Sequence, residues 1–202
     1  MTPRINITSS ETREKILDSA EWCYSQKGVS QTTLSDIAKK AGYTRGAIYW
    51  YFSSRDELLR TVIDRGKLDI LTRLEFISKT KKDKILPELI ECLHQCIHDA
   101  FFDSHTRNII EIIFHRCDTA EIEKIKSISP LLSEQEKILS TLTAILKKAR
   151  INNEITNDMN EETFSYLIYF FLIGLARSQI ITNKDMLSTA LNSLNLLLKN
   201  NL

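Results

Sequence analysis

A threonine, an arginine and a glycine stand in a row at positions 44–46, and a tyrosine follows one helical turn later. Thr44 is a residue type that caps helices, so it places Arg45 and Gly46 in the first turn of a short helix. An arginine there donates paired hydrogen bonds to O6 and N7 of guanine, and Gly46 has no side chain to hold the backbone away from DNA. The ring of Tyr49 is placed to reach a thymine methyl group. This spacing predicts a helix that reads bases in the major groove.

The residues around this helix suit phosphate groups. Thr33 caps the preceding helix, and backbone N–H groups at a helix N-terminus favour an anion. Trp50 and Tyr51 carry an N–H and an O–H that bond phosphate oxygens, and Arg55 adds a positive charge at the start of the next helix. The whole chain carries a net charge of only +1, but residues 37–55 include four basic residues and no acidic one. A local basic surface of this kind indicates a nucleic acid partner.

The aromatic run at residues 49–52 has a second interpretation, which is packing in a helical core. Four consecutive helical residues cannot all face one core, so part of the run must be exposed or used. On the pattern alone, DNA binding and core packing both stay open.

The elements that position these residues are all expected to be helices. The chain has 5 glycines and 3 prolines in 202 residues, too few for the many turns of an all-β fold. Capping pairs at Thr8–Glu11 and Thr33–Asp36 open the first two helices, and Gly28 and Gly42 end them. A fourth helix is expected from about Arg55 towards Phe76, joining the two halves without a flexible linker. Further helices are expected around residues 86–101, 109–114, 138–146, 161–181 and 184–199.

These elements predict an all-α fold in two parts. Residues 1–54 form a three-helix, helix-turn-helix DNA-binding domain, because two capped helices flank a short turn that contains glycine. Residues 55–202 form a helical ligand-binding and dimerisation domain.

The stretch TTLSDIAKKAGYTRGAIYWYFSSRDELL, residues 32–59, resembles the N-terminal domain of the TetR family of repressors. The residue pattern is most similar to the AcrR-like branch, which represses multidrug efflux pumps. A shorter segment, EIIFHRCD at Glu111–Asp118, resembles part of the ligand-binding domain of that branch. The resemblance implies a homodimer with a DNA-binding head and a ligand-binding body, acting on a palindromic double-stranded DNA operator.

The resemblance also implies roles for single residues. It places Ser35, Arg45, Gly46 and Tyr49 near bases, and it places Thr33, Trp50, Tyr51 and Arg55 near phosphates. With the capping threonine, the expected DNA-binding set is Thr33, Ser35, Thr44, Arg45, Gly46, Tyr49, Trp50, Tyr51 and Arg55. Two positions depart from the family, which commonly has histidine at Tyr51 and lysine at Ser53. Tyr51, like a histidine, can donate to a phosphate, whereas Ser53 lacks the positive charge that a lysine would bring.

The second half is rich in apolar and aromatic residues with a few polar ones among them, a mixture that suits a pocket for lipophilic compounds. Asp64 and Glu111 are acids on mostly apolar helices, so each is either solvated or placed to meet a cationic ligand. AcrR-like proteins resemble this chain in having an acid at the position of Asp64. The expected ligand-binding residues are Asp64, Cys96, Phe101, Ile110, Glu111, Phe114 and Tyr169. The alternative for each is that it fills the core.

The last two expected helices are apolar on more than one face. One face can pack inside the subunit, and the second needs another partner. A symmetric helical bundle between two subunits satisfies both faces; the alternative is a single, thickly covered internal helix. The residues expected at this dimer interface are Phe171, Gly174, Leu191, Leu194 and Leu198.

Cysteine and histidine residues in the second half open an alternative, a metal- or redox-responsive regulator. Cys92 and Cys96 are neighbours at i and i+4 on one helix, and zinc needs converging ligands, usually four. However, His94 and His98 project from a different face of that helix, and the spacing Cys-x-x-Cys is absent. Buried free cysteine acting as a small hydrophobic residue is the commoner case, so no metal site is expected.

Other classes of protein have less support. The chain lacks a Gly-rich phosphate loop, G-x-S-x-G and H-E-x-x-H, so neither an enzyme nor a cofactor is expected. An enzyme or a lipid carrier stays a further alternative, although neither needs the capped basic motif. The most apolar run, residues 164–176, is shorter than the roughly 18–20 residues that span a bilayer. With no signal-peptide stretch at the N-terminus, we expect a cytoplasmic protein with reduced thiols and no membrane partner.

Overall fold

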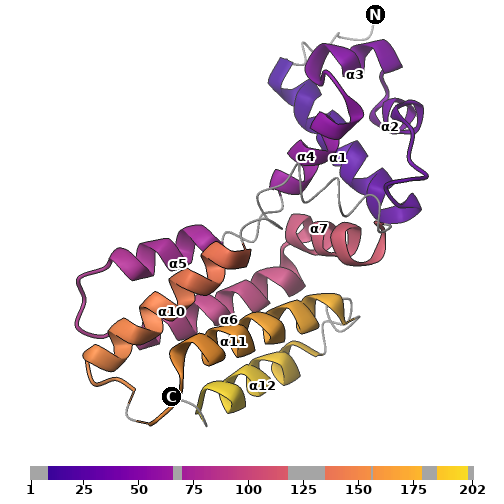
Figure 1. Cartoon of the computed structure of the whole chain (residues 1–202). Coiled ribbons are helices and arrows are strands. Elements are labelled where there is room, and N and C mark those ends of the chain that lie inside the picture. Colours follow the sequence, from indigo (N-terminus) through magenta and orange to yellow (C-terminus); the bar gives the residue numbers. More distant parts are fainter. Residues whose placement is uncertain (1–8, 66–69, 118–134, 156, 179–185, 200–202) are drawn as a thin grey trace, which may run out of the picture.

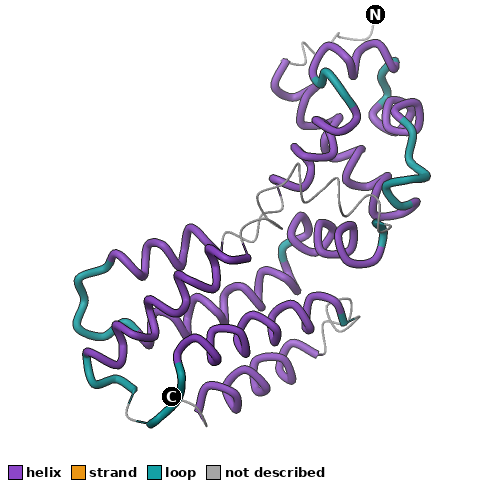
Figure 2. The backbone as a smooth tube through the Cα atoms, in the orientation of Figure 1, coloured by secondary structure: helices purple, strands orange, loops and turns teal. Residues whose placement is uncertain are grey.

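The computed structural model of the chain describes residues 9–65, 70–117, 135–155, 157–178 and 186–199. Within these ranges every regular element is a helix and no strand is present (Figures 1 and 2), which confirms the predicted all-α fold. The helices are α1 (Ser9–Lys27), α2 (Leu34–Ala41), α3 (Arg45–Tyr51), α4 (Arg55–Arg65), α5 (Ile70–Lys79), α6 (Leu86–Phe102), α7 (Ser104–His115), α10 (Gln135–Ile151), α11 (Glu161–Arg177) and α12 (Leu187–Lys199). They form two groups, which we call the head (α1–α4) and the body (α5, α6, α10, α11 and α12), and α7 lies where the two groups meet (Figure 1).

Local hydrogen bonds fix the helix-turn-helix of the head as the sequence predicts. Thr33 Oγ1 accepts from the backbone N–H of Asp36 at 3.1 Å, and the Asp36 carboxylate accepts from the backbone N–H of Thr33 at 3.0 Å, which completes a capping box at α2. Gly42 ends α2 with a φ of +76°, a left-handed conformation that favours glycine. Thr44 Oγ1 then accepts from the N–H of Ala47 at 3.2 Å and caps α3. Each of these caps is therefore formed by residues within four positions of each other.

The core of the head contains residues from five helices. Its buried members on α1–α4 are Ile16, Leu17, Ala20, Cys23, Tyr24, Val29, Leu34, Ile37, Ala38, Ala41, Ile48, Phe52, Leu58, Leu59, Val62 and Ile63. Three isoleucines of α7 complete it: Ile109, Ile112 and Ile113. Full burial of one such aliphatic side chain contributes about 1.5–3 kcal/mol. The head therefore packs as one unit with α7, and this helix ties it to the body.

The body has its own core. Helix α10 packs against α5 and α11, and α6 packs against α5 and α12. The break between α6 and α7 comes from Asp103, whose backbone is extended and whose carboxylate accepts from the N–H of Thr106 at 2.7 Å. Among the described residues, no helix is both long enough and apolar enough to cross a membrane.

Some expected boundaries differ from the structure. The stretch predicted as one helix from Arg55 towards Phe76 is described as two, α4 in the head and α5 in the body, and residues 66–69 lie outside the described residues. Helix α11 ends at Arg177, before the expected end near residue 181, because the backbone of Ser178 is extended. The cap predicted at Thr8 lies outside the described residues. The domain boundary after residue 54 stays a prediction, while α4 packs with the helices that precede it.

Candidate DNA-binding surface and ligand cavities

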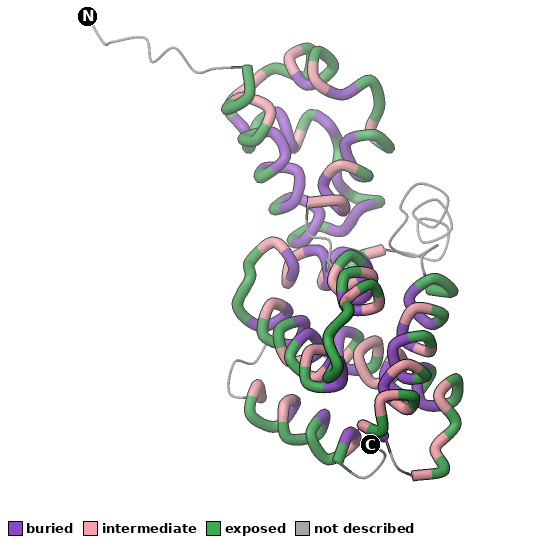
Figure 3. The backbone as a smooth tube through the Cα atoms, turned by 90° about the vertical axis from the view of Figure 1, so that its left-hand side faces the viewer, coloured by how far each residue is buried: buried purple, intermediate pink, exposed green. Residues whose placement is uncertain are grey.

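Helix α3 turns most of its side chains away from the protein. Ile48 and Phe52 are buried and anchor it to the head. Tyr49 is exposed, Tyr51 is half-buried, and the side chain of Trp50 is 90 % exposed. Figure 3 shows exposed positions at the end of the head that carries α3 in Figure 1, far from the body. Part of the aromatic run is thus exposed, as predicted, and an exposed tryptophan with no contact in the core is a candidate contact for a partner.

Arg45 and Tyr49 form a unit on the outer face of α3. Arg45 Nη2 donates to Tyr49 Oη at 3.1 Å, and the guanidinium lies 5.6 Å from the centre of the Tyr49 ring. A guanidinium has five N–H donors, so the bond to Tyr49 leaves most of those of the exposed Arg45 available to other acceptors. A Cβ placed on Gly46 would meet only Thr44 Oγ1, at an ordinary contact distance of 3.9 Å. Contacts within the subunit therefore do not require glycine at this position.

The N-terminus of α2 carries Thr33 and Ser35 on the surface, as predicted. Thr33 Oγ1 also donates to Asp36 Oδ2 at 2.7 Å, and Lys27 Nζ lies 2.8 Å from Asp36 Oδ1. The hydrogen bonds from Lys27 and Thr33 hold the pKa of Asp36 well below its ordinary value. The negative charge at this end of α2 is thus paired with a cation.

The four basic residues counted within residues 37–55 are not equally exposed in the structure. Lys39 and Lys40 are exposed in the last turn of α2, and Lys40 Nζ lies 3.7 Å from the centre of the Trp22 ring. Trp22 is a surface residue of α1 that the sequence interpretation missed. Arg55, in contrast, is half-buried, and its guanidinium donates to the carbonyl oxygen of Val29 inside the head. Arg55 thus has a structural contact within the head, and its phosphate contact stays a prediction.

Ser53, the position where the family commonly has lysine, has a structural contact instead. Its backbone N–H and hydroxyl both donate to Glu57 Oε2, and Ser54 Oγ accepts from the N–H of Glu57 at 3.0 Å. The bonds from Ser53 lower the pKa of Glu57. The two serines thus cap the first turn of α4 and contribute no charge to the surface.

The predicted ligand-binding residues of the body do not converge on one cavity. Cys96 and Phe101 are buried in the body core, and Tyr169 packs half-buried against it. Asp64 is half-buried on α4, in the head. Three of these positions therefore belong to the body core, and Asp64 belongs to the head. For Cys96 and Phe101 the structure shows core packing, the alternative that the sequence left open.

Ile110 and Glu111 do line a cavity, of about 390 Å³, which we call the junction cavity because helices of head and body both contribute to it. Its lining residues are Ser25, Gln26, Arg107, Asn108, Ile110, Glu111, His115, Arg116, Ala176 and Ser178. Glu111 accepts from Arg116 Nε at 2.9 Å, so its charge is paired. Phe114 packs half-buried beside Ile110 but does not line the cavity.

A second hollow is an open groove of about 650 Å³ between α5 and α6. Its walls are largely apolar and include Phe76, Ile77, Pro87 and Cys92. The side chain of Phe76 is 73 % exposed. Another hollow of about 550 Å³ lies between α10 and α11, beside Tyr166. The groove between α5 and α6 is the larger and more apolar of these two hollows.

The residues expected at the dimer interface separate into two sets. Leu194 and Leu198 are 0 % and 3 % exposed and pack inside the subunit, in the core that α12 shares with α6, so they are not available to a second subunit. Leu191 and Phe171 are half-buried against the same core. Gly174 is exposed, and a Cβ placed on it would have no atom within 4 Å. The expectation for Leu194 and Leu198 is therefore corrected: they hold the subunit together.

A different apolar surface stays exposed on the same two helices. Tyr166, Leu167 and Phe170 of α11 are 40 %, 42 % and 58 % exposed, and Leu196 of α12 is 62 % exposed. The rings of Tyr166 and Phe170 lie 5.7 Å apart. Apolar side chains thus lie on more than one face of these helices, as predicted, but Leu194 and Leu198 belong to the buried face.

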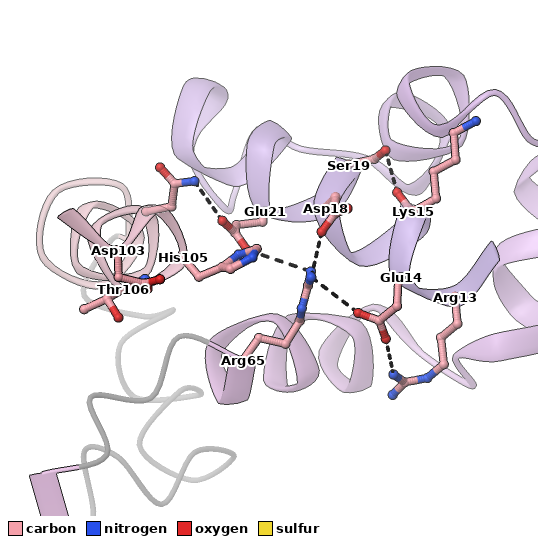
Figure 4. A network of polar contacts seen from close by, with 11 residues as sticks. Arg13, Glu14, Lys15, Asp18, Ser19, Glu21, Arg65, Asp103, His105 and Thr106 are labelled. Carbon is pink, nitrogen blue, oxygen red and sulfur yellow. Dashed lines mark hydrogen bonds and ion pairs between the residues drawn. The ribbon is translucent and has the colours of Figure 1, made fainter. Parts of the chain in front are cut away.

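A polar cluster that sequence reasoning missed joins the head to α7 (Figure 4). Glu21 of α1 is only 3 % exposed. Its carboxylate lies 2.8 Å from His105 Nδ1 and accepts from Asn108 Nδ2 at 2.7 Å. Arg65, at the end of α4, lies 3.9 Å from Glu21 and 2.7 Å from Asp18. We call this cluster the Glu21 node; its signal in the sequence is a charged residue within the apolar stripe of the first helix.

The thiols and imidazoles give no support to a metal- or redox-responsive site. A hydrogen bond with Cys92, followed by burial, raises the pKa of Cys96, and burial raises the pKa of Cys23. A raised pKa leaves little thiolate, the form that reacts and binds metals. His94 Nε2 lies 2.8 Å from Asn195 Oδ1. In the part of the chain that the structure describes, no three His, Cys, Asp or Glu side chains are grouped to hold a metal ion.

Comparison with known proteins gives a family match in the head and relatives that cover most of the chain. The family model described as "Bacterial regulatory proteins, tetR family" matches residues 16–62, which cover most of the head. The probable HTH-type transcriptional regulator ArpR of Pseudomonas putida is 32 % identical over 183 residues, covering 87 % of this chain and 83 % of that protein. The HTH-type transcriptional regulator TtgR, also of Pseudomonas putida, is 29 % identical over 189 residues, covering 90 % of this chain and 86 % of that protein.

Among solved structures, the chain is similar to SmeT, described as the repressor of the Stenotrophomonas maltophilia multidrug efflux pump SmeDEF. The TM-score is 0.74 at 24 % identity, covering 94 % of this chain and 89 % of SmeT. A complex of SmeT with triclosan matches with a TM-score of 0.70 at 25 % identity, covering 90 % of each chain. The likeness extends through both head and body.

Proposed function

Because the chain belongs to the tetR family of bacterial regulatory proteins, we propose that it is a transcriptional repressor that binds a palindromic operator as a homodimer and leaves it when a small lipophilic ligand binds. The observation that carries the proposal is the outer face of α3, where Arg45, Tyr49 and Trp50 are exposed although the head has a well-packed core. Residues 1–54 act as the DNA-binding domain and residues 55–202 as the ligand-binding and dimerisation domain, with α4 packed on the former.

In this proposal α3 is the recognition helix. Arg45 and Tyr49 contact base edges, and Gly46 allows the backbone to approach the groove. Ser35 contacts bases from α2. The remaining members of the DNA-binding set fix the position of the head through phosphate groups: Thr33, Thr44, Trp50, Tyr51 and Arg55.

The proposed dimer forms through the exposed apolar face of α11 and α12. A repressor that reads a palindrome needs two heads related by a twofold axis, and a twofold interface pairs the same surface on both subunits. Phe170 and Leu196 supply apolar area to that surface. Gly174 lies on α11 with open space beside it, so a helix of the second subunit can approach closely there. Phe171 and Leu191 flank the interface from the core side.

The proposed target is an operon for a multidrug efflux pump, which is what SmeT is described as repressing. The apolar groove between α5 and α6 supports a lipophilic ligand, because its volume of about 650 Å³ lies within the ordinary range for small-molecule sites. Such a ligand releases DNA only if it binds one dimer shape better than the other. A coupling of about 1–3 kcal/mol lowers operator affinity about 5–150-fold.

The experiment that tests the proposal selects bound sequences from a random pool of DNA duplexes with the purified full-length protein. We expect an inverted repeat whose half-sites are separated by one helical turn, roughly 34–36 Å, or a multiple of it. Light scattering on the same sample should give the mass of a dimer. Recovery of sequences with no repeated motif, or a protein of one-subunit mass at micromolar concentration, would contradict the proposal.

A further inference from the structure

We infer that the junction cavity is a binding site for a small organic anion, a carboxylate joined to a short apolar group. The cavity lies apart from the groove between α5 and α6, and its walls come from α1, α7 and the end of α11. Its volume of about 390 Å³ holds a molecule of about ten non-hydrogen atoms, at the small end of ligand sites. The charge around it then decides what kind of molecule it accepts.

The charge of the lining is positive. Arg116 and Glu111 neutralise each other through the bond at 2.9 Å. Arg107, on the same face of α7 one turn before Glu111, has no carboxylate within 4 Å among the described residues. Among the described residues, its half-buried guanidinium therefore has no carboxylate partner, and it places a positive charge at the wall of the cavity. A cation is repelled there, whereas a carboxylate accepts charge-assisted hydrogen bonds from arginine, often two at once.

The remaining walls divide into polar and apolar parts. Gln26 also lines the cavity, and its side-chain amide carries N–H donors. The hydroxyl groups of Ser25 and Ser178 donate to the carbonyl oxygens of Trp22 and Leu175. Towards a ligand, these two hydroxyl groups can therefore only accept hydrogen bonds. Buried Ile110 and Ala176 form an apolar wall. A ligand that complements these walls therefore has one anionic end and one apolar end.

The cavity also touches the Glu21 node. Asn108 lines the cavity and donates to Glu21 at 2.7 Å. An anion at Arg107 competes for the Asn108 amide and repels the Glu21 carboxylate, the group that holds α1 against α7 (Figure 4). An anion bound in the cavity therefore weakens the contact between α1 and α7, and operator binding weakens with it. This regulatory part rests on the proposed function; the binding site itself does not.

The test uses the full-length protein and three probes of the same shape: benzoate, benzylamine and benzyl alcohol. Isothermal titration calorimetry without DNA should detect benzoate and show much weaker or no binding of the other two. Arg107→Gln should lower benzoate affinity about tenfold or more, since a hydrogen bond to a charged group contributes about 1.5–3 kcal/mol. Arg177→Gln, an exposed arginine on α11 outside the lining, should leave it unchanged.

The outcomes separate the site from its regulatory effect. Benzylamine binding as well as benzoate, or benzoate binding unaffected by Arg107→Gln, would overturn the anion site. Operator affinity measured by fluorescence anisotropy should fall at least about fivefold in saturating benzoate, and Arg107→Gln should abolish this fall. An unchanged operator affinity would overturn the coupling while calorimetry upholds the site. A protein that binds no operator at all would refute the proposed function and leave the calorimetric result to decide the site alone.

Discussion

The head and the body both leave some apolar side chains exposed, but different contacts determine which ones. In the head, α3 buries Ile48 and exposes Trp50, so an aromatic residue of a type suited to a core lies almost wholly in solvent. In the body, α12 buries Leu194 completely and exposes Leu196 two residues later. The orientation of α3 is set by caps and a turn within a few residues of it. That of α12 is set by α6, about a hundred residues earlier in the chain. Short-range contacts thus determine the first surface and long-range packing determines the second.

The largest effect we predict comes from substituting the buried apolar face of the body, and a substitution on its exposed apolar face should act differently. Leu194→Ala should lower the free energy of unfolding by about 2–5 kcal/mol, because it leaves a cavity in a packed core. Phe170→Glu should leave the fold of the subunit intact and produce monomers, because Phe170 is 58 % exposed on the proposed dimer face. Chemical denaturation and light scattering distinguish the two outcomes. A stable Leu194→Ala protein that becomes monomeric would reverse the assignment of the two faces.

A smaller effect is expected from the cap of α2. Thr33→Ala removes the acceptor for the N–H of Asp36 and should lower the free energy of unfolding by about 0.5–2 kcal/mol. Thr33→Ser retains the hydroxyl and serves as the matched control. Urea denaturation measures both. Equal losses in the two variants would show that the methyl group of Thr33, and not the cap, is what matters.

The smallest effect concerns pH. The pKa of Asp36 is lowered in the folded chain by Lys27 and Thr33, so its charged form stabilises the fold at pH values above its ordinary pKa. That contribution is lost as the pH falls below about 4, the ordinary range of an aspartate. In Asp36→Asn it should be missing at neutral pH, and the difference from the wild-type protein should shrink on acidification. Thermal melts between pH 3 and 7 measure it; a difference that grows in acid would contradict this account.

The same contrast explains what could be predicted from the sequence. The capping box of Thr33 and Asp36, the cap at Thr44 and the exposure of part of the aromatic run all follow from residues within four positions of each other, and the structure bears them out. The stripe of isoleucines at residues 109–113 was recognised as helical. Nothing local indicated that α7 would complete the core of the head.

The cavities were beyond sequence reasoning for a similar reason. Ser25, Arg107 and Ser178 come from three distant parts of the chain, and no local pattern relates them. Glu111 was expected to be either solvated or placed to meet a cationic ligand. Its pairing with Arg116, five residues later, is a side-chain contact that spacing alone does not determine. Glu111 lines a cavity, but the net charge around it depends on neighbours that only the fold reveals.

The most direct test of the central claim measures how Arg45→Ala changes affinity for the selected operator and for random DNA of equal length. If α3 reads bases, Arg45→Ala should cost about 1–3 kcal/mol on the operator and much less on random DNA, with preference relaxed at one base of each half-site. The matched control Arg177→Ala, in the body, should change neither affinity. Equal losses on the operator and on random DNA would show that Arg45 contacts only phosphates, and that α3 does not read the sequence through this residue.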